Sequence, residues 1–537
     1  MFGNPGSTEV PLLDNLFNYP DIKYVLTLHE SIAVAMADGY ARASGKPGVA
    51  SVHAAPGTSH SLGALYDARN DCVPVIVMAG QQDSRLLIRE PFLSGDVVAL
   101  AGPLTKWHWQ VNRGEELPVA LRRAFKEATA PPSGPVFLSL ARNTLDEVVE
   151  VEEVDPQRYR VPQRIRGDSD EIRKAAEILV EARTPAIIAG FGVSRSQAVA
   201  ELVKLAEIVG ARVYAEPGTF PTDHAMYCGL PDLGTLPPAA ASPDVLMVVG
   251  AKMFVEYSYS ATPIVPSGTK AIHMDENIWE VAKNWPVDAA IVADPKSGLK
   301  ELLYTVQGML DKTALDRIDQ RKAELAGSRA QRASTAGLAE DPGQGFVSGD
   351  RLGVDLQEVL GPDSIIVDQG LRGSGYLKKH FQFKGAGAYH AEKGGSLGWA
   401  IGAAMGAKLA CPDKRVVALT GDGSAMYYPQ ALWTAAQQNI PITVVLCNNQ
   451  GYMAVKKHML MYEGEALRRR RFIGADIFGI DFVKMAESFG VAGVRVTEGS
   501  KLKSTLAEAV SAGRPMLVEV ALDPNDTGFN LPPVAGT

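Results

Sequence analysis

Residues 421–451 constrain the fold of this chain more than any other part of its sequence. An apolar run at residues 416–420 precedes this segment. The segment itself contains a helical stretch at residues 431–438 and a second apolar run at residues 442–447. This order predicts a strand, a helix and a second strand. Strands joined by such a crossover run parallel. We therefore expect Asp422 and Asn449, which follow the two strands, to lie at the same carboxyl edge of one sheet.

The residues at this edge suit a magnesium ion that holds a diphosphate. Mg²⁺ takes roughly six oxygen ligands and usually keeps phosphate and water oxygens among them. The Asp422 carboxylate, the Asn449 amide oxygen and the Gly451 carbonyl would supply the protein's share. Gly423 would let the backbone approach closely, and the amides near Ser424 would face phosphate oxygens. An ordinary turn with surface asparagines is the alternative, but the GDGS start, the spacing and the NNQG end together favour the cation site.

This segment resembles the thiamine diphosphate motif of the family that includes benzoylformate decarboxylase, pyruvate decarboxylase and acetolactate synthase. The resemblance covers nearly the whole chain and is strongest to the benzoylformate decarboxylases. It implies an α/β fold of three doubly wound parallel-sheet domains, which are pyrimidine-binding, central and diphosphate-binding, at residues 1–162, 169–310 and 345–525. The alternation of apolar and helical segments predicts the same layout. Family members carry a helix and a strand before FGNPGS, so we expect a truncated N-terminus.

Composition narrows the class of protein. A length of 537 residues predicts two to four domains. A net charge of −8 and a pI near 5.7 argue against nucleic-acid binding and favour a small substrate. The scattered cysteines, Cys72, Cys228, Cys411 and Cys447, predict reduced and mostly buried thiols. The sequence shows neither a secretory signal nor an apolar run near the ~20 residues of a membrane span, which predicts a cytoplasmic protein without membrane contact.

Glu30 is the first candidate catalytic residue. It stands between a predicted strand, residues 23–28, and a predicted helix, residues 31–43. This is the strand end where α/β sheets gather ligands, although a glutamate at a helix start also complements the helix dipole. Its HE and ADGYAR context matches the family's glutamate. The resemblance implies that Glu30 hydrogen-bonds the pyrimidine ring of the cofactor and promotes loss of the reactive proton.

Two further candidates precede helices of the first segment. His53 ends a predicted strand, residues 48–53, and an imidazole can exchange protons near neutral pH. The resemblance implies that it is an active-site histidine. Ser7 matches a serine that meets the substrate carboxylate in this family, but a helix N-cap is an equally good interpretation. We expect His60 to be structural or peripheral.

In the third segment, Gly395 and Leu397 lie in a GGSLG turn that resembles the turn under the family's cofactor. Leu397 would be the bulky side chain that bends the cofactor, and the Gly395 carbonyl would accept from its amino group. A core leucine is the alternative for Leu397. Tyr452 follows NNQG and is assigned to cofactor binding, and residues 368–370 are expected to form another loop at the cofactor.

Some positions depart from the benzoylformate decarboxylases. Where those enzymes have a second histidine on the central domain, this chain has Tyr257, a far weaker proton carrier at neutral pH. His458 stands where those enzymes have an aromatic pocket residue, and it would supply an imidazole from another side of the active site. The arginines at 468–471 could attract an anionic substrate, but we favour a solvated face. GFGVSRS, residues 190–196, is an incomplete glycine motif, so we expect a central domain without a nucleotide.

The sequence therefore predicts decarboxylation of a 2-oxo acid, aromatic and similar to benzoylformate, to an aldehyde and CO₂, with thiamine diphosphate and Mg²⁺. The catalytic residues would be Glu30, His53, Ser7 and His458. The resemblance implies a homodimer or homotetramer with active sites at the subunit interface. One alternative is a carboligase or lyase of the acetolactate synthase or benzaldehyde lyase type. Another is a non-catalytic regulator that binds a cofactor or a nucleotide.

Overall fold

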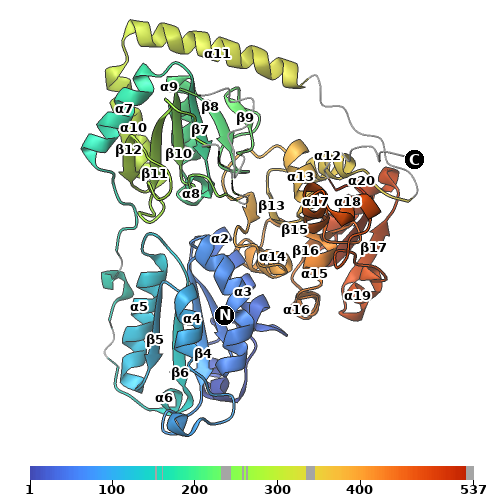
Figure 1. The fold of residues 1–537 in the computed structure, drawn as a ribbon. Helices are drawn as coiled ribbons and strands as arrows, with labels where there is room; N and C mark the ends of the chain where they lie inside the picture. The colour runs from blue at the N-terminus through green and yellow to red at the C-terminus, as the bar shows by residue number, and fades with distance from the viewer. Residues whose placement is uncertain are drawn as a thin grey trace. The chain divides into compact units, whose positions relative to one another are not determined.

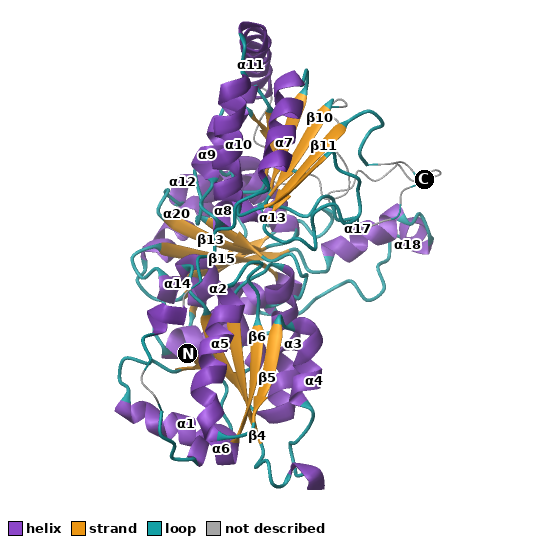
Figure 2. Cartoon of the chain, turned by 90° about the vertical axis from the view of Figure 1, so that its left-hand side faces the viewer, coloured by secondary structure: helices purple, strands orange, loops and turns teal. Residues whose placement is uncertain are grey.

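Three six-stranded α/β sheets make up the fold (Figure 1). The computed structural model describes residues 1–151, 154–159, 161–231, 243–256, 259, 261, 264–333 and 345–527. Helices flank the sheets (Figure 2), and the strand pairings within them are parallel. This confirms the predicted fold class. The first and third sheets belong to one compact unit, and the second sheet belongs to another.

The first sheet has the strand order β2-β1-β3-β4-β6-β5. Its strands are β1 (Phe2–Gly3), β2 (Val25–Leu26), β3 (Gly48–Val52), β4 (Val75–Gln81), β5 (Trp107–Val111) and β6 (Val136–Ala141). Its helices are α1 (Val10–Asn15), α2 (Glu30–Ser44), α3 (Ala54–Asn70), α4 (Val97–Ala101), α5 (Leu117–Thr129) and α6 (Arg142–Asp146). Because β1 pairs in parallel with both β2 and β3, the loops that follow these three strands gather at one edge.

The second sheet has the order β12-β11-β10-β7-β8-β9. Its strands are β7 (Pro185–Ala189), β8 (Arg212–Ala215), β9 (Tyr227–Gly229), β10 (Val245–Val249), β11 (Lys270–Asp275) and β12 (Ala289–Val292). Its helices are α7 (Ser169–Glu181), α8 (Phe191–Arg195), α9 (Val199–Val209), α10 (Pro295–Met309) and α11 (Lys312–Ala333). Asp168 and Asp294 cap α7 and α10 by accepting hydrogen bonds from backbone amides of the first turn, which fixes where these helices begin.

The third sheet has the order β14-β13-β15-β16-β18-β17. Its strands are β13 (Ser364–Gln369), β14 (Tyr389–Ala391), β15 (Arg415–Gly421), β16 (Ile442–Asn448), β17 (Ala492–Val496) and β18 (Met516–Ala521). Its helices are α12 (Gly349–Val359), α13 (Arg372–His380), α14 (Trp399–Ala410), α15 (Asp422–Ala425), α16 (Ala431–Gln437), α17 (Met453–Met461), α18 (Glu465–Arg469), α19 (Phe482–Ser488) and α20 (Gly499–Ser511). The strand, helix and strand predicted around GDGS and NNQG are confirmed as β15, α16 and β16.

Helices α2 and α14 join the first and third sheets through a close backbone contact. A Cβ atom on Gly39 would lie 2.0 Å from the Ala403 carbonyl oxygen, and one on Gly406 would lie 1.9 Å from that of Met36. These distances are too short for any side chain, so the two glycines allow the helices to meet. The apolar core of this unit is continuous across the contact and includes Trp399.

Buried charges reinforce this contact. Arg42 of α2 donates hydrogen bonds to Asp38 at 2.6 Å and to Asp71 at 2.7 Å, and the Trp399 indole donates to Asp38 at 2.9 Å. Asp67 of α3 lies nearby and accepts a hydrogen bond from the Ser396 amide at 3.1 Å. Burial, together with the charge of Glu392, raises the pKa of Asp67 to about 9. Asp67 is therefore protonated at neutral pH.

Asp67→Asn should weaken the pH dependence of stability. A carboxyl group whose pKa is raised in the folded state stabilises the fold fully below its unfolded pKa of 3.8, and the contribution is lost as pH rises toward about 9. The stability of the wild type relative to Asp67→Asn should thus fall between pH 5 and pH 8 by at least about 1.4 kcal/mol, the value of one pKa unit. Chemical denaturation at the two pH values measures this.

A matched control is Asp170→Asn, since the Asp170 side chain is 84% exposed. That variant should follow the wild type at both pH values. A wild-type stability that changes in parallel with that of Asp67→Asn would show that Asp67 is ionised in the fold.

Two further predictions from the sequence concern membrane-spanning helices and the state of the cysteines. Of the helices that the structure describes, none has both the length and the apolar character that a membrane span needs. All four cysteines are free thiols, as predicted. Cys447 is buried, whereas Cys72, Cys228 and Cys411 are half-buried, so the expectation that most of them are buried is wrong.

Candidate active site

Glu30 is the first residue of α2 and is 6% exposed. His29 caps the helix by accepting from the Ser31 amide, which places Glu30 at the carboxyl end of β2. Its carboxylate accepts a hydrogen bond from the Asn4 amide group at 3.4 Å, in the loop after β1. A Cβ atom on Gly57 would lie 2.9 Å from Glu30 Oε1, so the glycine leaves room for this side chain.

His60 lies beside Glu30 at this site. Its Nδ1 is 3.1 Å from Glu30 Oε2, and its ring stacks on that of His29 with centroids 5.2 Å apart. His29, Glu30 and His60 thus form a compact group whose candidate ligand atoms lie within 4.8 Å of one another. His60 reaches Glu30 from the second turn of α3 with a side chain that is 56% exposed, so the expectation that it is structural or peripheral stays a prediction.

A second carboxylate, that of Glu9, contacts His53. The sequence did not indicate Glu9 as functional. His53 caps α3 at the end of β3, and its Nδ1 lies 2.9 Å from the Glu9 carboxylate. Glu9 is 2% exposed and also accepts hydrogen bonds from the Thr8 hydroxyl and the Gly6 amide. Nδ1 also lies 3.0 Å from the Thr8 hydroxyl, so this side of the ring faces Glu9 and Thr8. Glu9 therefore orients the imidazole.

Two glycines explain why Glu9 and His53 can meet. A Cβ atom on Gly6 would lie 2.3 Å from the His53 ring, and one on Gly80 would lie 1.8 Å from Glu9 Oε1. Gly6, not Ser7, is the N-cap of the short helix Ser7–Glu9, so the N-cap interpretation of Ser7 is wrong. Ser7 itself is exposed.

Asp422 and Asn449 meet at the carboxyl edge of the third sheet. The register pairs Gly421 of β15 with Cys447 of β16, which brings the residues after both strands together. Asp422 accepts hydrogen bonds from the Gly423 amide at 2.6 Å and from the Gly451 amide at 3.0 Å. The Asn449 side-chain oxygen is buried and makes no hydrogen bond within the described part of the chain. Such an oxygen lacks a partner that a bound cation would supply.

A narrow cavity lies at this edge. Its lining residues come from the three segments at the ends of β13, β15 and β16 and are Gly370, Leu371, Arg372, Gly421, Asp422, Gly423, Ser424, Asn449, Gly451, Tyr452 and Met453. Burial raises the pKa of Asp422, and the amides that donate to it lower the pKa in part. A Cβ atom on Gly423 would lie 2.5 Å from the Tyr452 ring, so the glycine keeps the cavity open. The donor set of one carboxylate and one free amide oxygen fits a hard cation.

Gln369, at the end of β13, ties the neighbouring turn to this cavity. Its side-chain oxygen accepts from the Ser424 hydroxyl at 2.6 Å and from the Gly398 amide at 3.0 Å. Its amide group donates to the Ser396 carbonyl at 2.9 Å. The turn that contains Gly395 and Leu397 is thereby fixed against α15 and β13, and Leu397 is half-buried.

Three other sequence candidates lie elsewhere or have other partners. His458 is exposed on α17. Tyr257 lies outside the described residues. Arg468 and Arg469 pair with Glu465 at 2.6 Å and have side chains that are 63% and 74% exposed, which confirms the solvated face for these two.

Comparisons with known proteins identify the family. Models of thiamine pyrophosphate enzymes match three parts of the chain: the N-terminal binding domain at residues 1–98, the central domain at 172–302 and the C-terminal binding domain at 373–520. The chain belongs to the thiamine pyrophosphate enzyme family. Thiamine pyrophosphate is the thiamine diphosphate of the sequence prediction, which is thereby confirmed at the level of the family.

The proteins similar to this chain are named for one of two activities, acetolactate synthase or decarboxylase. A probable acetolactate synthase large subunit of Methanocaldococcus jannaschii is 31% identical over 99% of this chain and 91% of that protein. A benzoylformate decarboxylase of Pseudomonas aeruginosa is 30% identical over 97% of this chain and 95% of that protein. The solved structure of a Rhodococcus jostii 4-hydroxybenzoylformate decarboxylase has a TM-score of 0.83 at 30% identity and covers 97% of this chain and 96% of that chain. This protein is thus a thiamine pyrophosphate enzyme of the decarboxylase and acetolactate synthase family.

Proposed function

We propose that this enzyme decarboxylates an aromatic 2-oxo acid, such as benzoylformate, to an aldehyde and CO₂. The observation that carries the proposal is the imidazole of His53, which Glu9 holds at 2.9 Å on the same sheet edge as Glu30. A decarboxylase that releases an aldehyde needs a positioned group to deliver and remove protons. Two similar proteins are named as decarboxylases of benzoylformate and 4-hydroxybenzoylformate, which supports the aromatic substrate.

Bound thiamine pyrophosphate supplies the electron sink for loss of CO₂. In our proposal, Glu30 hydrogen-bonds the pyrimidine ring of the cofactor and exchanges a proton with it. Asn4 and His60 orient the Glu30 carboxylate for this.

We assign the diphosphate to the cavity beside Asp422. The side chains of Asp422 and Asn449 and the Gly451 carbonyl would hold Mg²⁺ there, since the first two offer buried oxygens at one place. The remaining cofactor contacts come from the backbone of Gly423, Ser424 and Gly395 and from the side chains of Leu397 and Tyr452.

The substrate contacts in the proposal come from the first segment and from α17. His53 Nε2 exchanges protons with the reacting carbonyl, and the exposed Ser7 hydroxyl donates to the substrate carboxylate. His458, exposed on α17, is the second imidazole available to the substrate.

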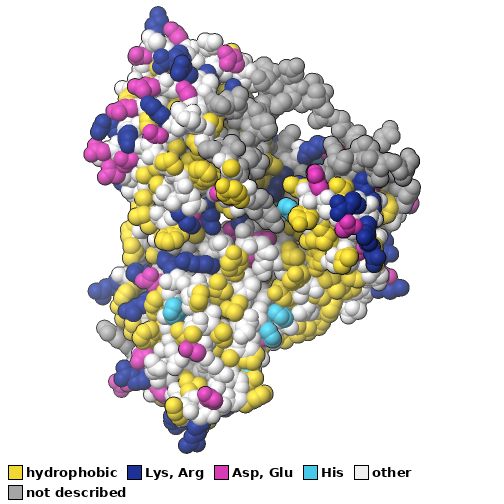
Figure 3. All heavy atoms as spheres, viewed as in Figure 1, with side chains coloured by type: hydrophobic (Ala, Val, Ile, Leu, Met, Phe, Trp, Pro, Cys, Tyr) yellow, Lys and Arg dark blue, Asp and Glu magenta, His cyan; other side chains and the backbone are white. Residues whose placement is uncertain are grey.

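We further propose that two copies of the chain assemble so that the active sites lie at their interface, in a dimer or a tetramer. Large apolar side chains are exposed after strands at both ligand edges: Ile88 and Phe92 are 90% and 85% exposed after β4, and Tyr462 and Ile473 are 86% and 78% exposed after β16. Apolar side chains also spread over the face shown in Figure 3. In our proposal, a partner chain covers these side chains.

The second candidate is a carboligase of the acetolactate synthase type, favoured by the identity of 31% to a probable acetolactate synthase. It would use the same site but join the substrate to a second carbonyl compound. The presence of Glu30, Asp422 and Asn449 together argues against a non-catalytic regulator.

Product analysis distinguishes these functions. With benzoylformate, thiamine pyrophosphate and Mg²⁺, a decarboxylase releases benzaldehyde, which an NADH-dependent alcohol dehydrogenase converts with a loss of absorbance. A carboligase yields a 2-hydroxy ketone, which chromatography separates from the aldehyde. Turnover to free benzaldehyde that requires the cofactor supports the proposal. A 2-hydroxy ketone as the main product, or the absence of turnover in a cofactor-loaded protein, would contradict it.

A further inference from the structure

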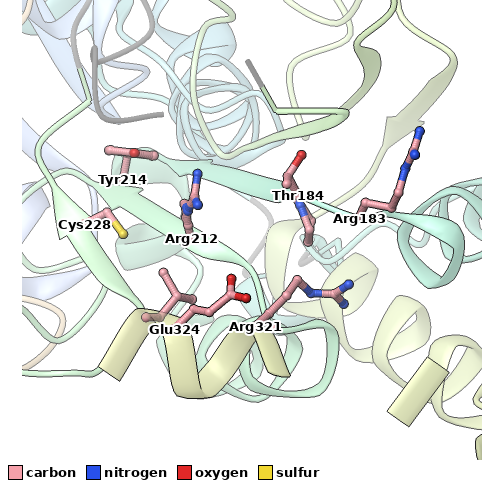
Figure 4. Close-up of a pocket in the computed structure, with 10 residues that line it drawn as sticks. Arg183, Thr184, Arg212, Tyr214, Cys228, Arg321 and Glu324 are labelled. Atoms are coloured by element: carbon pink, nitrogen blue, oxygen red, sulfur yellow. The ribbon is translucent and has the colours of Figure 1, made fainter. Parts of the chain in front are cut away.

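A cavity of about 250 Å³ opens between the amino-terminal edge of the second sheet and α11 (Figure 4). It is lined by Arg183, Thr184, Pro185, Gly210, Arg212, Tyr214, Cys228, Arg321, Glu324 and Leu325. Pro185 and Arg212 are the first residues of β7 and β8, which run parallel. The glycine motif at residues 190–196 follows β7 and therefore lies at the opposite edge, where α/β sheets bind nucleotides. The cavity is distinct from that position.

Arg321 of α11 makes no ion pair with a described residue, and the nearby charges of Asp244 and Glu324 compensate its own only in part. Its guanidinium donates to the carbonyl oxygens of Ala182 at 2.9 Å and Val209 at 2.6 Å, which are neutral acceptors. Its Nε is buried and has no hydrogen-bond partner in the described part of the chain. Burial, followed by the charge of Arg317, lowers the pKa of Arg321, while the charges of Asp244 and Glu324 raise it in part. A bound anion would raise it further.

Arg212 is the second cationic side chain of the cavity. It is half-buried at the start of β8, and its guanidinium has no ion-pair partner among the described residues. Figure 4 shows Arg212 in the middle of the group, above Arg321 and Glu324 of α11. Arg183 has its own partner, Asp244 at 3.9 Å, and its side chain is 87% exposed. Arg212 and Arg321 are thus the two cations of the lining without an ion pair among the described residues, and Glu324 is the acidic residue beside them.

The size and the walls of the cavity limit what can bind. Pockets for drug-sized ligands measure about 300–1,000 Å³, so this cavity suits a smaller molecule than a dinucleotide. Tyr214 and Leu325 are buried and offer apolar surface, which suits a short carbon chain. Arginine forks match the oxygens of phosphate, and a phosphate monoester carries a charge of about −1.5 to −2, close to that of two arginines.

We propose that this cavity binds a small phosphorylated metabolite, with its phosphate group between Arg212 and Arg321 and its carbon chain toward Tyr214. The site is independent of the proposed decarboxylase activity. It gives the central domain a ligand other than a nucleotide.

Glycerol 3-phosphate is the probe that tests this site. The full chain is first saturated with thiamine pyrophosphate and Mg²⁺, so that the diphosphate site cannot take up the probe, and binding is then measured by titration calorimetry. Glycerol and glycerate are the comparison ligands, because they lack the phosphate but keep the carbon chain. We expect glycerol 3-phosphate to bind at least about tenfold more tightly than glycerate.

Arg212→Gln should weaken this binding at least about tenfold, and Arg212→Lys should keep part of it, since lysine retains the charge without the fork. Arg173→Gln is the matched control, because Arg173 is an exposed arginine of α7 in the same domain, with a side chain that is 56% exposed. It should bind the probe as the wild type does. Melting curves of each variant show that it is folded.

Three results would overturn the proposal. They are equal affinities of the wild type and Arg212→Gln, equal affinities for glycerol 3-phosphate and glycerate, and no heat of binding with the folded wild type. Because every readout is binding of a molecule that is not a 2-oxo acid, none of these results depends on the enzyme's reaction.

Discussion

Glu30→Gln is expected to lower kcat for 2-oxo acid decarboxylation by about 10²–10⁴, the usual contribution of a positioned acid or base. Glutamine has nearly the same shape as glutamate and can still accept the hydrogen bond from Asn4. It cannot exchange a proton as a carboxylate does. The loss should therefore fall on turnover, while the binding of thiamine pyrophosphate and the melting temperature change little.

The measurement is steady-state release of aldehyde at saturating cofactor, together with a cofactor titration of the same variant. Glu115→Gln is the matched control, because Glu115 is exposed in the same segment. It should turn over as the wild type does. Full turnover of Glu30→Gln with bound cofactor would remove Glu30 from the mechanism and leave the fold unaffected.

The sequence predicted those parts of the candidate site whose residues lie close together along the chain. Asp422 and Asn449 end neighbouring strands within one strand, helix and strand unit, so the spacing and the handedness of the crossover suffice to bring them together. Glu30 was found in the same way, at the junction of β2 and α2. The strands predicted at residues 416–420 and 442–447 lie within β15 and β16, because buried parallel strands are continuous apolar runs.

The sequence could not indicate contacts between distant loops. Glu9 reaches His53 only because β1 lies beside β3 in the sheet and because Gly6 and Gly80 leave space for the two side chains. Gln369 likewise holds Gly398 through a hydrogen bond between loops. Gly6 and Gly80 were local signs of the first contact, but a single glycine in a turn or a strand has many explanations.

Asp422→Asn is expected to raise the concentration of Mg²⁺ needed for cofactor binding by at least about 10–100-fold, the loss seen when a group that merely supports a metal ligand is removed. The substitution takes away the single carboxylate of the proposed ligand set. It also turns an amide group toward the Gly451 N–H or the Gly423 N–H, both of which now donate to the carboxylate. Removal of Mg²⁺ from the wild type by a chelator should cause the same loss, and added Mg²⁺ should reverse it.

Titration of thiamine pyrophosphate at several Mg²⁺ concentrations measures the effect. Asp363→Asn is the control, since the Asp363 side chain is 85% exposed on the same domain. It should need no more Mg²⁺ than the wild type. An unchanged Mg²⁺ requirement in Asp422→Asn would contradict the proposed metal site.

The same two variants test whether the active sites are shared between protomers. Suppose that each site combines Glu30 of one protomer with Asp422 of its partner. A dimer of one Glu30→Gln chain and one Asp422→Asn chain then has one site with both substitutions and one intact site. Random pairing makes about half of the dimers mixed. A refolded mixture of the two variants, assayed at a Mg²⁺ concentration that suffices for the wild type but not for Asp422→Asn, should therefore regain about one quarter of wild-type turnover. If Glu30 and Asp422 of the same chain act together, every site contains one substitution and the mixture stays inactive, which would contradict the shared arrangement while leaving both residue assignments intact.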